Sequence, residues 1–278
     1  MLILIFYIKQ NVMKKYVIKP LYPEYEYIPI SATELEHFVC PMEAFKTIQV
    51  NKEDPDYMAK LQMKDEVFAM GSYVESIIQA ALMGGREMGY SMAKVVRQNI
   101  ETDFNWYKRS KVVDWKPTNK EREFVYNNLE KYVDENMKLY EPNYYNTTNF
   151  RQHVFVECGK YLFYFSWEVD TARICGSSSD VIIDHKLSAQ ARTDETIAKK
   201  RQMYYYPFLT LYGTGQKAIS FIYNVNRKLK NIEGKTQFLS YDITMEKAEE
   251  IFREDIKKYA IALYKWEVKN EHLDLEYR

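Results

Sequence analysis

Two alternating apolar runs around a short turn constrain the fold of this chain more than any other feature. Residues 150–157 (FRQHVFVE) and residues 161–169 (YLFYFSWEV) alternate between apolar and polar positions, and Cys158-Gly159-Lys160 separates them. Alternation with a period of two is typical of a strand with one buried face, and a short glycine-containing turn joins such strands into an antiparallel hairpin. A β-sheet is therefore predicted in the second half of the chain.

The segments after this hairpin predict a mixed sheet flanked by helices. Residues 180–187 (DVIIDHKL) carry a continuous apolar run that indicates a third, buried strand. A helical period follows over residues 194–212, and two further strands are predicted over residues 217–225 and 236–241. The order strand–strand–strand–helix–strand is typical of an α/β fold with a mixed central sheet.

The N-terminal half is predicted to be mostly helical. Ser31 and Glu34 have the spacing of a capping box, which marks the start of a helix. Further helices are expected over residues 56–83, which end at Gly84-Gly85, and over residues 86–102 and 119–139. We therefore expect an N-terminal extension over residues 1–30 and a single domain over residues 31–278. Within this domain we expect a helical part at 31–145, a sheet core at 146–243 and a C-terminal helix at 244–270.

Charge, cysteine content and hydropathy narrow the class of protein. The 39 basic and 39 acidic side chains give a net charge of zero. A nucleic acid would therefore have to bind in one groove in which positive charge is concentrated. Cys40, Cys158 and Cys175 lie far apart, which argues against a disulfide framework or a four-thiolate metal site and predicts a reducing cytoplasm as the location. The apolar run at residues 1–8 is shorter than the ~20 residues of a membrane span, so no membrane association is expected. Residues 1–12, ahead of Met13, are assigned no function.

The candidate catalytic residues lie on the predicted sheet. Asp170 is expected to close the second strand, and Asp184-His185-Lys186 lies on the third. Because side chains alternate along a strand, Asp184 and Lys186 should share a face that His185 does not. Two carboxylates and an ammonium would then meet. Carboxylates hold a hard cation such as Mg²⁺, which activates a water and polarises a phosphoryl oxygen. The lysine would position or deprotonate that water, or offset charge in the transition state.

This arrangement resembles the signature of the PD-(D/E)XK nuclease superfamily, and in particular its RecB-type branch, which includes phage recombination exonucleases. In that branch a later helix carries Gln-x-x-x-Tyr, matched here by Gln202 and Tyr206, and an earlier helix carries Gly-x-x-His followed by Glu, matched by Gly71 and Glu75. The element at residues 31–41 is similar to the branch's N-terminal motif. Two departures are Val74, where many members have histidine, and Trp167, where a glycine often precedes the first aspartate.

The resemblance implies a phosphodiester hydrolase that uses Mg²⁺ or Mn²⁺ to cleave DNA into products with 5′-phosphate and 3′-hydroxyl ends. It assigns metal binding to Glu75, Asp170, Asp184 and the backbone carbonyl of His185. Lys186 would activate water, and Gln202 and Tyr206 would position the strand. No cysteine follows Cys175, so the iron–sulfur cluster of some members is not expected. The resemblance favours an exonuclease of phage or mobile-element recombination and repair. Its partners would be DNA and a single-strand annealing or recombination protein, and an oligomer is compatible with it.

Three alternatives remain open at this stage. The chain could be a restriction-type or structure-specific endonuclease. It could instead be a catalytically inactive DNA-binding or assembly module with a nuclease fold, which is suggested by Val74 at the position where many members have histidine. It could also be an α/β protein in which the motif is a coincidence. The run Lys199-Lys200-Arg201 either guides DNA phosphates toward the site or forms a solvated helix face.

Overall fold

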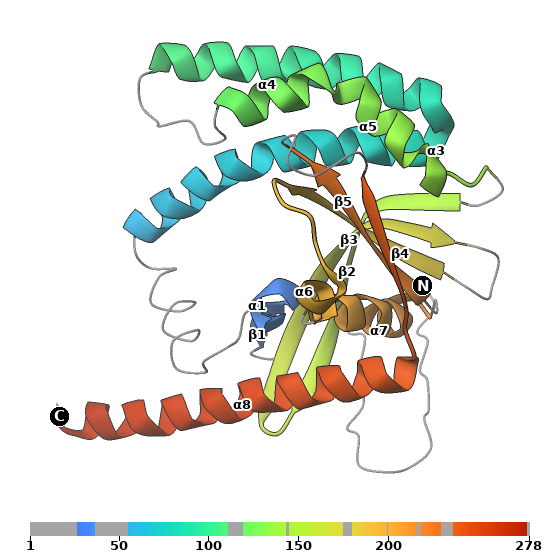
Figure 1. Ribbon diagram of the computed structural model, residues 1–278. Helices are drawn as coiled ribbons and strands as arrows, with labels where there is room; N and C mark the ends of the chain where they lie inside the picture. Colours follow the sequence, from blue (N-terminus) through green and yellow to red (C-terminus); the bar gives the residue numbers. More distant parts are fainter. Residues whose placement is uncertain are drawn as a thin grey trace, which may run out of the picture.

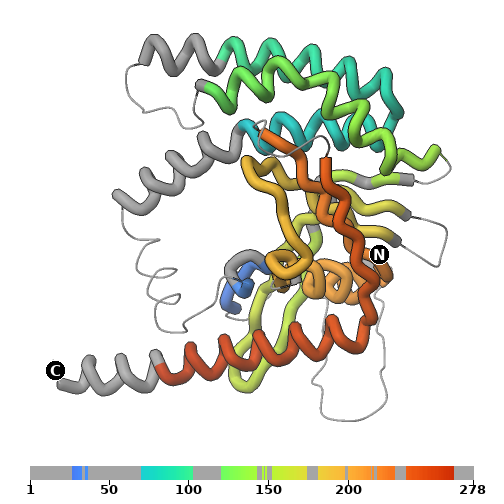
Figure 2. The backbone as a smooth tube through the Cα atoms, viewed as in Figure 1, coloured from blue at the N-terminus to red at the C-terminus, as the bar shows by residue number. Residues whose placement is uncertain are grey.

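A mixed β-sheet forms the centre of the protein, and helices cover both of its faces (Figure 1). The computed structural model describes residues 27–36, 55–110, 119–142, 145–174, 180–198, 200–215, 218–228 and 236–276 (Figure 2). Within these ranges the six-stranded sheet has the order β1-β3-β4-β5-β6, and β2 pairs with β3. The strands are β1 (Ile28–Ser31), β2 (Tyr145–Cys158), β3 (Tyr161–Ile174), β4 (Asp180–Ser188), β5 (Ala218–Arg227) and β6 (Gln237–Asp242). The predicted α/β fold with a mixed central sheet is confirmed.

The β2–β3 hairpin is longer than the sequence pattern predicts. Its register runs from Cys158↔Tyr161 at the turn to Tyr145↔Ile174 at the far end, and Gly159 adopts a φ of 62° in the turn. Asp170 therefore lies inside β3, whereas we expected it to close the strand. Thr171 and Ala172 are both buried, so this end of the strand is buried on both faces. A strand that is buried on both faces shows no alternation of apolar and polar residues, which is why the pattern ends near residue 170.

Strand β1 belongs to the segment that we treated as an N-terminal extension. It pairs in parallel with β3, from Ile28↔Phe163 to Ser31↔Ser166, and Ile30 is buried in the core. Four residues are too few to show a period, and Pro29 argues against a central strand. The edge position of β1 accommodates this proline, because one side of an edge strand needs no hydrogen-bond donor.

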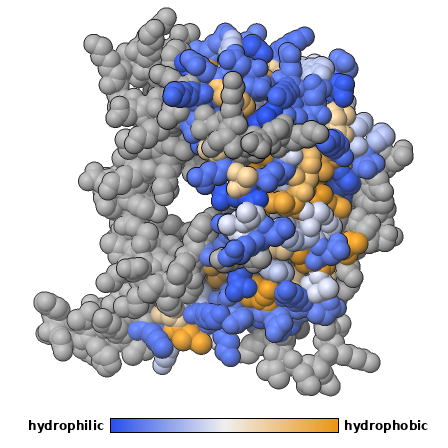
Figure 3. Space-filling view, viewed as in Figure 1, coloured by the Kyte–Doolittle hydropathy of each residue, from blue (hydrophilic) through white to orange (hydrophobic). Residues whose placement is uncertain are grey.

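One face of the sheet is covered by a helical layer built from α3, α4 and α5. Helix α3 (Pro55–Ser110) reverses direction at Gly85, so that its second half runs back above the first, with α4 and α5 drawn between the two halves in Figure 1. α4 (Asn119–Asn127), α5 (Leu129–Asn136) and the short 3₁₀ helix η2 (Met137–Leu139) pack against it. Their shared core reaches the sheet at Ile183 of β4. The outer surface of this layer is mainly hydrophilic (Figure 3).

The opposite face is covered by α7 (Gln202–Thr214) and α8 (Met245–Glu276), together with the short α1 (Ala32–Glu36) and α6 (Asp194–Ala198). Phe252 of α8 joins these layers, because its ring lies 5.2 Å from that of Phe165 in β3 and 5.0 Å from that of Phe208 in α7. The single helix predicted over residues 194–212 is wrong, since the chain breaks between α6 and α7. None of the helices in the described ranges is long and apolar enough to cross a membrane.

Replacing Gly85 by alanine is expected to lower the free energy of unfolding by about 1–3 kcal/mol. Gly85 has φ 80° and ψ −173°, a combination that is essentially restricted to glycine. The control is Gly71→Ala in the same helix, because a Cβ there meets no described atom within 4 Å. Alanine at that position should leave stability unchanged or raise it by up to ~1 kcal/mol. Urea denaturation followed by circular dichroism compares the two, and equal effects would contradict the assignment of strain to Gly85.

Candidate active site

Asp170 and Asp184 lie at the point where β3 and β4 separate. In the described chain these strands pair at Thr171↔Ile183, Ala172↔Ile182 and Arg173↔Val181, whereas β4 continues along β5 through Asp184 and beyond. Past the last β3–β4 pair, the backbone N–H of His185 donates to Oδ2 of Asp170 at 2.7 Å. The Asp170 carboxylate thus replaces a ladder acceptor, and the fork brings it beside the residues of β4.

Asp184 and Lys186 share one face of β4, as the alternation along the strand predicts. The Lys186 ammonium donates a hydrogen bond to Oδ1 of Asp184 at 2.9 Å and lies 2.8 Å from Oδ2. The Asp184 side chain is only 2% exposed, whereas that of Lys186 is 45% exposed. The lysine therefore compensates a buried carboxylate while part of its side chain remains in contact with solvent.

Glu75 reaches the same region from α3, and Gln79 fixes its position. Nε2 of Gln79 donates to Oε1 of Glu75 and to the backbone carbonyl of Asp170, both at 2.8 Å. One buried amide therefore ties the helix to β3. Gln79 was not among the predicted site residues. Its spacing of four residues from Glu75 places both on one helix face, and this is the signal that could have identified it.

The acidic side chains of this group repel one another. Burial and the charge of Asp184 raise the pKa of Asp170 well above its usual value, and burial raises the pKa of Glu75, to which Asp184 also contributes. Burial alone would lower the pKa of Lys186, but Asp184 and Asp170 more than offset it and raise that pKa. Three carboxylates therefore share one ammonium. Lys186 is a cation in this arrangement, which favours charge compensation over proton abstraction as its role.

The donor chemistry of the group suits a hard divalent cation, because such ions prefer carboxylate oxygens and would neutralise the surplus negative charge. Among the described residues, however, no three His, Cys, Asp or Glu side chains are grouped as they stand to hold a metal ion. Other contacts already occupy oxygens that a cation would need. Lys186 contacts both oxygens of Asp184, His185 holds Asp170, and Gln79 holds Glu75. A cation on Asp184 would require Lys186 to withdraw, since metal–oxygen bonds span only ~2.0–2.6 Å.

Gln202 and Tyr206 lie on the first two turns of α7, and both are largely buried. Tyr206 is close enough to Lys186 to contribute to its raised pKa, after the larger effects of burial and of the aspartates. The structure therefore places Tyr206 near the Asp184–Lys186 pair. For Gln202, it shows a buried position at the start of the helix.

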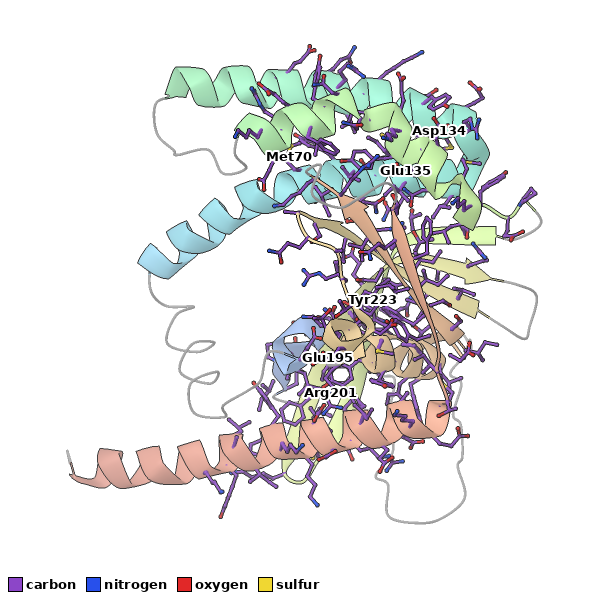
Figure 4. The ribbon with its side chains drawn as sticks, in the orientation of Figure 1. Met70, Asp134, Glu135, Glu195, Arg201 and Tyr223 are labelled. Carbon is purple, nitrogen blue, oxygen red and sulfur yellow. The ribbon has the colours of Figure 1, made fainter. Side chains whose placement is uncertain are left out.

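Lys200 and Arg201 lie just before α7 and not on a helix face, and a role of either residue in guiding DNA stays a prediction. Lys200 lies in the break before α7, with Nζ 3.9 Å from Glu36 of α1. The guanidinium of Arg201 lies 3.5 Å from Asp255 of α8, on the side of the sheet covered by that helix (Figure 4). These two ion pairs connect the start of α7 to α1 and to α8. Lys199 falls outside the described residues.

The His185 side chain lies within a buried polar network that the sequence pattern did not predict. Thr171 Oγ1 lies 2.9 Å from its Nε2, and Asn224 Nδ2 lies 2.8 Å from its Nδ1. Because an amide nitrogen donates, Nδ1 is the acceptor and Nε2 carries the proton that is donated to Thr171. Burial lowers the pKa of His185 to about 3, so the ring is neutral. The side chain of His185 therefore acts through packing and hydrogen bonds.

Three asparagines extend this network into a closed ring. Asn224 donates to Asn136 at 2.6 Å, Asn136 to Asn226 at 2.9 Å, and Asn226 back to Asn224 at 3.2 Å. Glu135 of α5 accepts hydrogen bonds from Arg227 and Thr236 beside the ring, and it lies between α5 and the sheet in Figure 4. A fully satisfied buried network specifies one packing arrangement. It anchors the strand that carries Asp184 and Lys186.

Asp170→Asn is expected to stabilise the metal-free protein at pH 8. The folded state raises the pKa of Asp170, so ionisation of this carboxyl opposes folding. An amide removes the charge and keeps an acceptor for the N–H of His185. A group with a raised folded pKa contributes stability that is complete below its unfolded pKa and is lost as pH rises through its folded pKa. The advantage of the variant should therefore shrink as the pH falls toward ~4.

Thermal unfolding in EDTA across pH 5–8 measures this effect. Asp242→Asn, at an exposed position on β6, is the matched control and should show no comparable gain. A lower Tm for Asp170→Asn than for the wild-type protein at pH 8 would contradict the expected repulsion.

Comparison with solved structures finds 13 similar chains. No protein-family model matches the chain, and no curated protein is significantly similar in sequence. The chain is similar to a candidate exonuclease from Eubacterium rectale, with 14% identity over 86% of this chain and 80% of that chain and a TM-score of 0.46. It is also similar to the protein SSO0001, with 14% identity over 62% of this chain and 75% of that chain and a TM-score of 0.31. Because both TM-scores are below 0.5, functional conclusions depend on the residues of this chain.

Proposed function

We propose that the protein is a metal-dependent deoxyribonuclease. The observation that carries this proposal is the meeting of Glu75, Asp170, Asp184 and Lys186, from three elements, where β3 and β4 separate. Buried charges add little to stability, so an excess of buried carboxylates beside one ammonium needs another reason. Phosphodiester hydrolysis provides it, because the reaction uses carboxylates to hold a cation and a positive side chain to offset developing negative charge.

The cation would be Mg²⁺ or Mn²⁺, held by Glu75, Asp170, Asp184 and the backbone carbonyl of His185. When bound, it polarises the phosphoryl oxygen and lowers the pKa of a bound water. Lys186 then offsets the negative charge on the phosphoryl group and orients the attacking water by hydrogen bonding. Its raised pKa supports this role, because it keeps the side chain charged at neutral pH.

Gln202 and Tyr206 would position the DNA strand next to this centre. The proximity of Tyr206 to Lys186 supports that assignment for Tyr206, whereas that of Gln202 rests on the resemblance to RecB-type nucleases. The same resemblance favours an exonuclease that leaves 5′-phosphate and 3′-hydroxyl ends during phage or mobile-element recombination or repair. A single-strand annealing or recombination protein would be its protein partner.

The test is to incubate the purified full chain with end-labelled linear duplex DNA and with covalently closed circular DNA. Each substrate is supplied with Mg²⁺, with Mn²⁺ or with EDTA, in parallel with Lys186→Ala. The proposal expects metal-dependent loss of the linear substrate only, and none with the variant. Cleavage of the closed circle would identify an endonuclease. No cleavage of either substrate would reject the nuclease proposal and favour a DNA-binding or assembly role.

A further inference from the structure

Tyr223 lies directly beside Asp184. The two residues are register partners in the parallel β4–β5 pair, and partners in adjacent strands project from the same face of a sheet. Tyr223 is 2% exposed, and its ring lies 4.8 Å from that of Phe221 and 6.4 Å from that of Tyr241. In Figure 4 it lies at the centre of the molecule, near α6 and α7. The ring is thus fixed by core packing on the face that carries Asp184.

The Tyr223 hydroxyl and one oxygen of Asp184 are both buried without a hydrogen bond among the described residues. The hydroxyl has no partner, although buried tyrosine hydroxyls usually find one. Oδ2 of Asp184 accepts no hydrogen bond either, because that of Lys186 goes to Oδ1, although the Lys186 ammonium also lies 2.8 Å from Oδ2. A buried hydroxyl without a hydrogen-bond partner therefore lies in register beside a carboxylate whose Oδ2 is in ion-pair contact with Lys186 and accepts no hydrogen bond. Unsatisfied buried groups of this kind occur preferentially at functional sites.

The electrostatics of Tyr223 suit a hydrogen-bond donor. Burial raises the pKa of its phenol, and Asp184 makes the largest contribution of any charged group. The hydroxyl is therefore available as a hydrogen-bond donor. The Asp184 carboxylate is the acceptor that its charge and position favour.

We propose that Tyr223 is a positioning residue whose hydroxyl donates to Oδ2 of Asp184 and holds this carboxylate in its cation-binding orientation. The inference rests on the proposed metal-dependent function. A cation can bind Asp184 only when Lys186 withdraws from its oxygens, and the carboxylate then loses the contact that orients it. Carboxylates that ligate metals are themselves held by hydrogen bonds, which fix their orientation. Tyr223 supplies this bond from a ring that the core already immobilises.

The experiment is a titration of metal-free protein with Mn²⁺ by isothermal titration calorimetry, without DNA. Tyr223→Phe should weaken Mn²⁺ affinity by about 10–100-fold, the usual effect of losing a residue that supports a metal ligand. The Tm of the metal-free variant should be unchanged or higher, because phenylalanine keeps the packing and removes an unpaired hydroxyl. A residue with a purely structural role would not separate these two readouts.

Two further variants make the outcome decisive. Tyr241→Phe is the matched control, because its ring packs near Tyr223 while its hydroxyl bonds Asp194 away from the site, and its Mn²⁺ affinity should equal that of the wild-type protein. Asp184→Asn tests the site itself. If Asp184→Asn loses Mn²⁺ binding but Tyr223→Phe retains wild-type affinity, the role of Tyr223 is overturned and the proposed function stands. If Asp184→Asn binds Mn²⁺ normally, the proposed metal site fails, and the role of Tyr223 fails with it.

Discussion

Lys186→Ala is expected to reduce metal-dependent DNA cleavage by roughly 10³-fold while leaving the fold and DNA binding largely intact. The ammonium is the one positive side chain in hydrogen-bond contact with Asp184 among the described residues, and its raised pKa keeps it charged. Its loss removes the group that would offset negative charge on the phosphoryl group. Single-turnover digestion of end-labelled duplex DNA measures the effect on the chemical step.

The same variant should bind Mn²⁺ at least as tightly as the wild-type protein, because the ammonium competes with a cation for the oxygens of Asp184. Lys200→Ala is the matched control, since Lys200 has similar exposure and pairs with Glu36. It should retain cleavage. If Lys186→Ala kept more than about a tenth of wild-type activity, the role given to this lysine, worth 10²–10⁴-fold for a positioned catalytic group, would be wrong.

Asp184→Asn is expected to lose both cleavage and metal affinity. The side chain is 2% exposed and lies at the fork of β3 and β4, where its charge would attract the proposed cation. An amide keeps the volume but removes this charge. We expect cleavage to fall on the order of 10³-fold, comparable to the loss of a group that acts on the transition state.

Thermal unfolding with and without Mn²⁺ gives a second readout for this variant. A cation that binds only the folded state adds about 2.7 kcal/mol of stability at 100 times its Kd, so Mn²⁺ should raise the Tm of the wild-type protein and not that of Asp184→Asn. Asp194→Asn, in the exposed first turn of α6, is the control and should respond as the wild-type protein does. Equal Mn²⁺ stabilisation of all three proteins would place the cation elsewhere.

The local patterns in the sequence predicted most of the architecture. Alternation predicted the β2–β3 hairpin and the shared face of Asp184 and Lys186, because the direction of a side chain in a strand depends only on its position in that strand. The helical layer and the order of elements after the hairpin were predicted on the same local basis. Structural features that produce no periodic pattern of apolar residues were not predicted. β1 is too short to show one, and the break between α6 and α7 interrupts a continuous helical pattern.

The sequence by itself therefore determined the type and order of most elements and the spacing of the acidic and basic residues. Only the tertiary structure decided which of these residues meet. Gln79 bonds the carbonyl of Asp170 across 91 residues of chain, and Asn224 bonds Asn136 across 88. Tertiary packing likewise placed Lys200 and Arg201 in ion pairs with other helices. The physical reason is that periodicity is set by neighbouring residues, whereas such contacts depend on how distant elements pack.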